Sequence, residues 1–202
     1  PLAWLNVGRG YAVAKALGAV TMSTAAWPAY VWARGVVGAR SAIAVAALTL
    51  ALPAFSYSGL LMTEVVFYPL LALTAWQMVR MIAEPTALRQ AGLVALIGAA
   101  ALTRLQGVVL VVVLPTALVL ARVPLRRYTM ALAGVAALAV AWLLWQLLRG
   151  GGVLGAYSTT ASRGYHVGAA LRFIVYHAGA LVLETGLLPV AAVALLWSAR
   201  HR

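Results

Sequence analysis

The chain has 202 residues, of which 65% are hydrophobic and 9% are charged, and its formal net charge is +12. A soluble domain carries about 25% charged residues, so the composition excludes an ordinary soluble protein and indicates an integral membrane protein. The absence of cysteine excludes both a disulfide framework and a thiolate metal site.

The apolar runs predict an all-α fold, a polytopic transmembrane helical bundle of about seven spans that forms a single domain over residues 1–202. In chain order, the predicted spans are 11–33, 41–57, 61–82, 88–103, 105–121, 128–148 and 170–198. The one sizeable loop, 149–168, is rich in Gly, Ser and Thr, which disfavours a helix. Basic residues punctuate the apolar runs, which favours membrane lipids over nucleic acid as partners.

A permanently charged residue, Arg104, interrupts the longest apolar stretch. A single helix over residues 88–121 would be about 50 Å long, whereas the hydrocarbon core of a bilayer is about 30 Å thick. The sequence TRLQG, residues 103–107, is the only place for a turn, and Gly107 permits the bend. We therefore expect a hairpin of two short helices with Arg104 at its tip, near a membrane surface.

The basic residues are distributed unequally between the two sides of this topology. Nine fall on one side: Arg34, Arg40, Arg80, Arg89, Arg122, Arg126, Arg127, Arg200 and Arg202. Six fall on the other: Arg9, Lys15, Arg104, Arg149, Arg163 and Arg172. Short basic loops face the cytoplasm, so the richer side is predicted to be cytoplasmic, with the N-terminus outside and the C-terminus inside. The bias toward Arg, Ala, Val, Leu and Gly suggests a GC-rich bacterial genome, hence a bacterial plasma membrane.

Four segments on the outer side carry residues that suit a binding site: Arg9, Lys15, Glu64, Arg104, Arg163, His166 and Arg172. Several cations around few acids suit an anionic ligand such as a phosphate or a diphosphate, and the planar fork of arginine matches phosphate oxygens. Solvated interfacial bases are an equally good interpretation of Arg9, Arg149 and Arg163. Because a buried Glu64 is costly unless it is paired, a structural ion pair with Arg104 is an alternative to a binding role. No residues have the spacing of metal ligands.

A series of short motifs occurs in order over about residues 9–122: AYVWAR (29–34), LPAFSYSG (52–59), the pair Thr63-Glu64, and TRLQG (103–107). In this order and spacing, the chain resembles the GT-C superfamily of integral-membrane glycosyltransferases. The resemblance is to members that use polyprenyl-phosphate sugars, of the protein mannosyltransferase and aminoarabinose transferase type.

The resemblance implies an enzyme that moves a sugar from a polyprenyl-phosphate donor to a lipid, glycan or protein acceptor on the outer face. We predict no cofactor and no metal-ligating residues, and the sequence leaves metal dependence open. The resemblance also implies that the donor phosphate is bound by Arg104, Lys15, Arg163 and Arg172, with Glu64 and His166 in supporting roles.

An inverting transfer needs a general base. In the family this base is an acid in the first outer loop, and the chain contains no aspartate. We therefore expect the base upstream of Pro1, in a first span and first outer loop that this chain lacks. A glutamate already engaged by Arg104 is a poor base, so we expect the chain alone to bind donor without transferring sugar.

Two other functions remain open from the sequence. One is a transporter or flippase for an anionic lipid or glycan, which an inverted repeat would favour, although the sequence contains no such repeat. The other is a non-catalytic assembly partner whose outer loops bind another membrane protein.

Overall fold

The structure is a computed structural model that describes residues 6–51, 63–148, 168, 171–176 and 178–179. Every regular element within these residues is a helix, so the predicted all-α fold is confirmed. The chain separates into two compact units, the first made of residues 1–50 and 57–145 and the second of residues 51–56 and 146–202. The single transmembrane domain over residues 1–202 stays a prediction.

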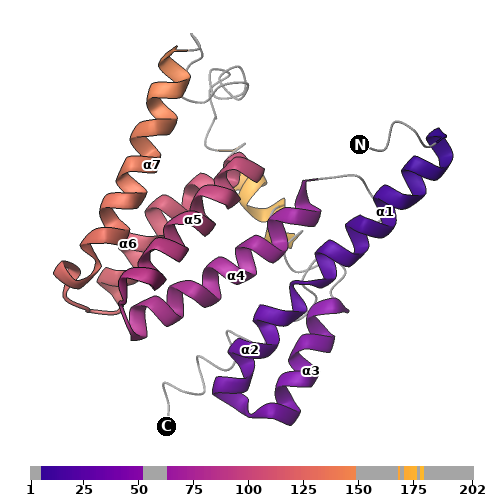
Figure 1. Cartoon of the computed structure of the whole chain (residues 1–202), viewed down its shortest axis with the longest axis horizontal. Helices are drawn as coiled ribbons and strands as arrows, with labels where there is room; N and C mark the ends of the chain where they lie inside the picture. Colours follow the sequence, from indigo (N-terminus) through magenta and orange to yellow (C-terminus); the bar gives the residue numbers. More distant parts are fainter. Residues whose placement is uncertain (1–5, 52–62, 149–167, 169–170, 177, 180–202) are drawn as a thin grey trace. The chain divides into compact units, whose positions relative to one another are not determined.

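Figure 1 shows helices α1 to α7, and all but the last residues of α7 belong to the first unit. The elements are, in chain order, α1 (Val7–Ser23), α2 (Ala26–Val37), α3 (Ala39–Leu50), α4 (Glu64–Ala83), α5 (Ala87–Thr103), the 3-10 helix η2 (Leu105–Val109), α6 (Leu110–Leu120), the 3-10 helix η3 (Leu125–Tyr128) and α7 (Thr129–Leu148). The predicted spans from 61 to 148 coincide with α4 to α7, apart from shifts of a few residues at their ends.

Two of the other predictions fall partly outside the described residues. The span 41–57 begins within α3, and its part beyond residue 51 is not among the described residues. Of the span 170–198, only 171–176 and 178–179 are described, and these are helical. The predicted loop 149–168 lies outside the described residues except for Gly168.

The first predicted span, 11–33, is two helices instead of one, so that prediction is wrong in this detail. Pro28 explains the break, because it has no backbone N–H to donate to the carbonyl of Thr24 and its ring crowds that carbonyl. Instead, the backbone N of Trp27 donates to Thr24 O at 3.1 Å, which tightens the turn. At its other end, α2 stops at Gly38, whose φ of 81° reverses the chain so that α3 packs against α2 (Figure 1).

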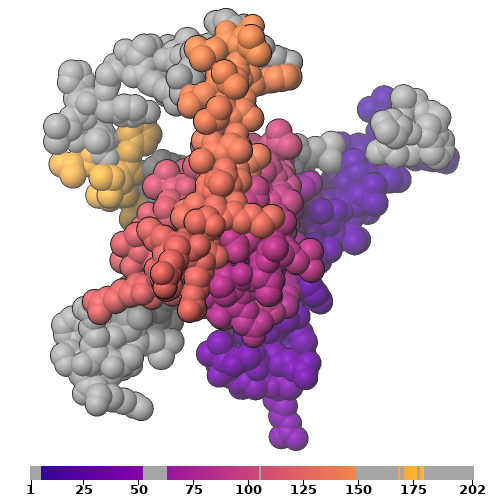
Figure 2. Space-filling view, turned by 60° about the vertical axis from the view of Figure 1, so that its left-hand side comes forward, coloured from indigo at the N-terminus to yellow at the C-terminus, as the bar shows by residue number. Residues whose placement is uncertain are grey.

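The hydrophobic core of the first unit lies among α4, α5, α6 and α7. Its buried side chains recur every three or four residues, which places them on one face of each helix. They are Met78, Met81, Leu93, Ile97, Ala100, Leu110, Leu114, Leu118, Tyr128, Ala131 and Val135. Gly134 allows α7 to approach α5 closely, because a Cβ at this position would lie 2.8 Å from Cγ2 of Val94. Figure 2 shows α7 in orange, with one side of the helix left uncovered.

Among the described residues, two helical segments are long and apolar enough to cross a membrane, Glu64–Ala83 and Leu125–Leu148. Three further apolar helices are shorter: Ala39–Leu50, Ala87–Thr103 and Gln106–Leu120. Many large apolar side chains on these helices are exposed, as expected for surfaces that face lipid. These features support membrane association, and the seven-span bundle stays a prediction.

A buried glutamine, Gln90, joins several segments at one end of the core. Its Nε2 donates to Arg127 O at 3.1 Å and to Pro85 O at 3.3 Å, and its Oε1 accepts from Ala131 N at 3.0 Å. Ala131 lies in the first turn of α7, where backbone N–H groups have no partner within the helix. Nearby, the hydroxyl of Tyr128 donates to a backbone carbonyl of α4 at 2.8 Å. These bonds fix the α4–α5 turn (residues 84–86) to the α6–α7 connection (residues 121–128).

Candidate functional site

Arg104 lies in a sharp turn between two helices, as the hairpin prediction requires. α5 ends at Thr103, Arg104 itself is extended with φ −149° and ψ 141°, and η2 begins at the next residue. The backbone N of Gly107 donates to Arg104 O at 2.9 Å and closes the turn. Gly107 lies so close to α5 that a Cβ would be 2.5 Å from the backbone of Ala100, so a side chain has no room there. The predicted turn between two short helices at Arg104 is therefore confirmed, and its place near a membrane surface stays a prediction.

An ion pair joins Arg104 to the start of α4. Nη1 of Arg104 contacts Oε1 of Glu64, and the two side chains are 26% and 21% exposed. Glu64 lies in the first turn of α4, where a negative charge also interacts favourably with the helix dipole. The pairing of these two residues, which the sequence offered as an alternative to a binding role, is thus present in the structure.

Gln106 completes this cluster and was not among the residues predicted from the sequence. Its Oε1 accepts a hydrogen bond from Nε of Arg104 at 3.1 Å. The sequence could have indicated Gln106 by its position two residues after Arg104, because a turn there brings the two side chains close together. Arg104, Glu64 and Gln106 together form what we call the turn cluster.

The guanidinium of Arg104 keeps capacity to bind a further group. It has five N–H donors, and the turn cluster engages Nη1 and Nε. Within the described part of the chain, Nη2 of Arg104 has no hydrogen-bond partner. Nη2 is thus the open edge of the guanidinium, and the Arg104 side chain as a whole is 26% exposed.

The other predicted phosphate ligands are not seen to join the turn cluster. Lys15 is exposed on α1, where its Nζ lies 5.5 Å from the ring centroid of Tyr11. Arg172 is exposed in a helical segment of the second unit, whereas the turn cluster belongs to the first unit. Arg163 and His166 lie outside the described residues. Of the predicted site residues, the structure brings together Glu64 and Arg104.

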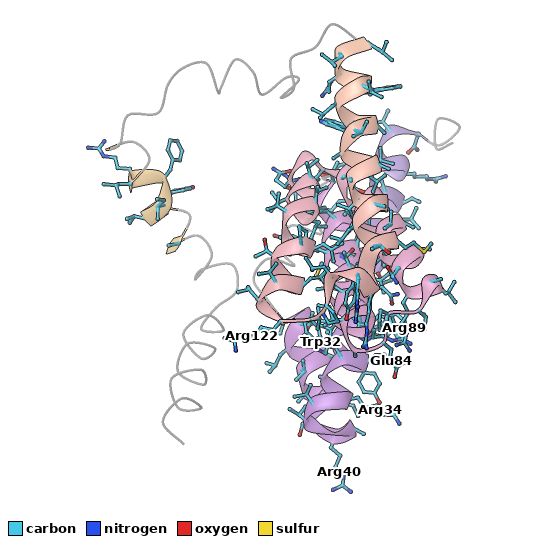
Figure 3. All side chains as sticks on the ribbon, turned by 90° about the vertical axis from the view of Figure 1, so that its left-hand side faces the viewer. Trp32, Arg34, Arg40, Glu84, Arg89 and Arg122 are labelled. Atoms are coloured by element: carbon cyan, nitrogen blue, oxygen red, sulfur yellow. The ribbon has the colours of Figure 1, made fainter. Side chains whose placement is uncertain are left out.

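Several residues predicted to lie on the opposite, cytoplasmic side are found toward one end of the first unit. Figure 3 shows Arg34, Arg40, Glu84, Arg89 and Arg122 toward one end of this unit, in the lower part of the view. The acid among them is engaged, since Oε2 of Glu84 lies 2.5 Å from Nη1 of Arg89. This grouping agrees with the predicted placement of these arginines on one side. The assignment of that side to the cytoplasm stays a prediction.

No family model, curated protein or solved structure matches this chain. The likeness to GT-C glycosyltransferases therefore remains a resemblance of sequence motifs. What the turn cluster can do chemically follows from its own atoms. An arginine with an open edge, held by a carboxylate and an amide, can bind a phosphate oxygen and stabilise negative charge that develops on it.

Proposed function

We propose that this chain forms the donor-binding part of a multi-pass GT-C-type glycosyltransferase of a bacterial plasma membrane, which takes a sugar from a polyprenyl-phosphate donor on the outer face. The observation that carries the proposal is the open edge of Arg104, which is held at a helix turn by Glu64 and Gln106. The two long and three shorter apolar helices support several membrane crossings. The proposed acceptor is a lipid, a glycan or a protein.

In the proposed reaction, the bond between the anomeric carbon and a phosphate oxygen breaks as the acceptor hydroxyl attacks that carbon. Negative charge grows on the departing polyprenyl phosphate, and Arg104 stabilises it through charge-assisted hydrogen bonds. Glu64 acts through Arg104 by fixing the orientation of the guanidinium. Lys15, Arg163 and Arg172 are proposed as further phosphate contacts. The proton of the acceptor hydroxyl passes to a general base, and Glu64 is poorly suited to that role because Arg104 already engages it.

Binding of a polyprenyl phosphate to the purified full chain tests this proposal directly. Farnesyl phosphate would be titrated into the protein in a neutral detergent, and the dissociation constant compared between the wild type and two Arg104 variants. Arg104→Gln should bind roughly ten- to a hundredfold more weakly, since a hydrogen bond to a charged group contributes about 1.5–3 kcal/mol. Arg104→Lys should be intermediate, because it keeps the charge and loses the fork. Arg34→Gln, which removes an exposed arginine from α2, is the matched control and should bind normally.

Two results would count against the proposal. The first is a folded Arg104→Gln protein that binds farnesyl phosphate as tightly as the wild type. The second is a uniform loss of helix content in the Arg104→Gln, Arg104→Lys and Glu64→Gln proteins, which would assign the ion pair a purely structural role.

A further inference from the structure

The end of α6 has an arginine where helices usually have glycine. Arg122 has φ 54°, and it is the one residue other than glycine with positive φ among those described. Its backbone N donates to Val119 O at 3.0 Å, and the N of Val123 donates to Leu118 O at 3.4 Å. This pair of bonds is the Schellman motif, whose left-handed position favours glycine because a Cβ is strained there. Arg122 therefore adopts a left-handed conformation in which its backbone is strained.

The α6–α7 connection, residues 121–128, carries two further arginines beside Arg122. Arg122, Arg126 and Arg127 are all exposed, and no described acid forms an ion pair with any of them. Glu84, the acid of the neighbouring α4–α5 turn, is engaged by Arg89. Three positively charged residues therefore lie in one short connection, and none of them has an ion-pair partner among the described acids.

Large apolar side chains are exposed in and next to the same connection. Leu125, between the arginines, is 44% exposed, and Leu120 in the last turn of α6 is 77% exposed. A free phosphate or a nucleic acid would leave these side chains in water. A ligand that combines an anionic headgroup with an apolar body covers both.

The connection is also held in one conformation. Gln90 binds the carbonyl of Arg127 and the first turn of α7, and Tyr128 binds a carbonyl of α4. A surface fixed in this way loses little conformational entropy when it binds a ligand.

We infer that the α6–α7 connection binds the headgroups of anionic phospholipids, with the three arginines on the lipid phosphates and Leu125 in the apolar interface. The inference rests on membrane association and is independent of the proposed glycosyl transfer. It also accounts for Arg122, since glycine at this position would relieve the backbone strain but remove a charge from the headgroup site.

The test uses the purified full chain in a neutral detergent, titrated with dioleoylphosphatidylglycerol or dioleoylphosphatidylcholine, with bound lipid counted by native mass spectrometry. Each arginine near an anionic surface contributes about a fivefold gain in binding. Arg122→Gly should therefore bind phosphatidylglycerol about fivefold more weakly, and the variant that adds Arg126→Gln and Arg127→Gln about a hundredfold more weakly. Arg34→Gln, which removes one exposed arginine from α2, is the matched control and should bind normally.

A second readout gives Arg122→Gly an effect of opposite sign. Because glycine suits the left-handed position, the thermal midpoint without lipid should rise by about 2–4 °C while lipid binding falls. A lower midpoint would show that the arginine is kept for folding stability, and would overturn the inference. So would equal binding of the two lipids, unchanged binding by Arg122→Gly, or displacement of phosphatidylglycerol by millimolar inorganic phosphate. The fold loss of phosphatidylglycerol binding caused by Arg122→Gly should be the same with and without Arg104→Gln, which separates this test from that of the proposed function.

Discussion

Replacing Gln90 by methionine should destabilise the first unit far more than an ordinary polar substitution. Methionine has nearly the same length and volume, so the change creates little cavity and removes chiefly hydrogen bonds. Gln90 makes three of them, two donated by Nε2 at 3.1 and 3.3 Å and one accepted by Oε1 at 3.0 Å. The side chain is buried, so water does not readily replace its partners.

The magnitude follows from these contacts. A hydrogen bond between neutral groups contributes about 1 kcal/mol net, and the bond at 3.3 Å contributes less because it is long. The backbone N–H of Ala131 would in addition lose its partner in a buried position, and such a group costs about 1–3 kcal/mol. We therefore expect Gln90→Met to lower the free energy of unfolding by about 3 kcal/mol.

Gln77→Met provides the matched control. Gln77 is partly buried and makes a single hydrogen bond, from its Nε2 to Arg89 O at 3.1 Å, so its loss should cost about 1 kcal/mol. Both variants would be unfolded reversibly in mixed micelles of neutral detergent and dodecyl sulfate, followed by tryptophan fluorescence. Equal destabilisation by the two variants would refute the role of Gln90. Hydrogen exchange at the amide of Ala131 should accelerate in Gln90→Met alone.

Three further predictions concern the α5–η2 turn and the orientation of the chain. Gly107→Ala should lower the free energy of unfolding by at least about 2 kcal/mol, because the new Cβ would meet the backbone of α5; a melting curve like that of the wild type would contradict the close approach. A double-mutant cycle with Glu64→Gln and Arg104→Gln should give a coupling energy of about 1 kcal/mol in unfolding experiments, since both side chains are partly exposed, and a coupling of zero would show that the pair does not stabilise the fold. Single cysteines at Gln106 and Arg126, in a chain that has none, should differ in intact cells: an impermeant thiol reagent should label the first and not the second, and the reverse pattern would invert the proposed topology.

The sequence was sufficient to predict α4 to α7 because their apolar runs have lengths that few other structures can accommodate. The hairpin at Arg104 was predictable for the same reason, since one helix over that stretch would be too long for a bilayer. The pairing of Arg104 with Glu64 could be anticipated because two opposite charges in apolar surroundings stabilise each other.

Other features depend on contacts between distant parts of the chain. Gln90 bonds to Ala131, 41 residues away, and no local pattern marks that partner. The left-handed conformation of Arg122 was equally hidden, because a sequence pattern places glycine or asparagine at such a position. Pro28 was visible in the sequence, but the length of the apolar run outweighed it in the prediction of one continuous helix. Gln106 was overlooked because an uncharged amide gives little signal beside a charged neighbour.

The difference in length between α4 and α5 has a consequence for the surrounding lipid. α5 has 17 residues, whereas α4 has 20. At 1.5 Å per residue, α5 is about 26 Å long and α4 about 30 Å, so α4 matches the thickness of an average hydrocarbon core and α5 falls short of it. In the proposed membrane setting, this hydrophobic mismatch thins the bilayer around α5, at a cost of a fraction of a kcal/mol per Å. Where the bilayer is thinner, the headgroups of one leaflet would lie closer to Arg104. A lipid-linked phosphate could then contact the turn while staying at the level of the surrounding headgroups. The protein should accordingly partition into bilayers of shorter acyl chains.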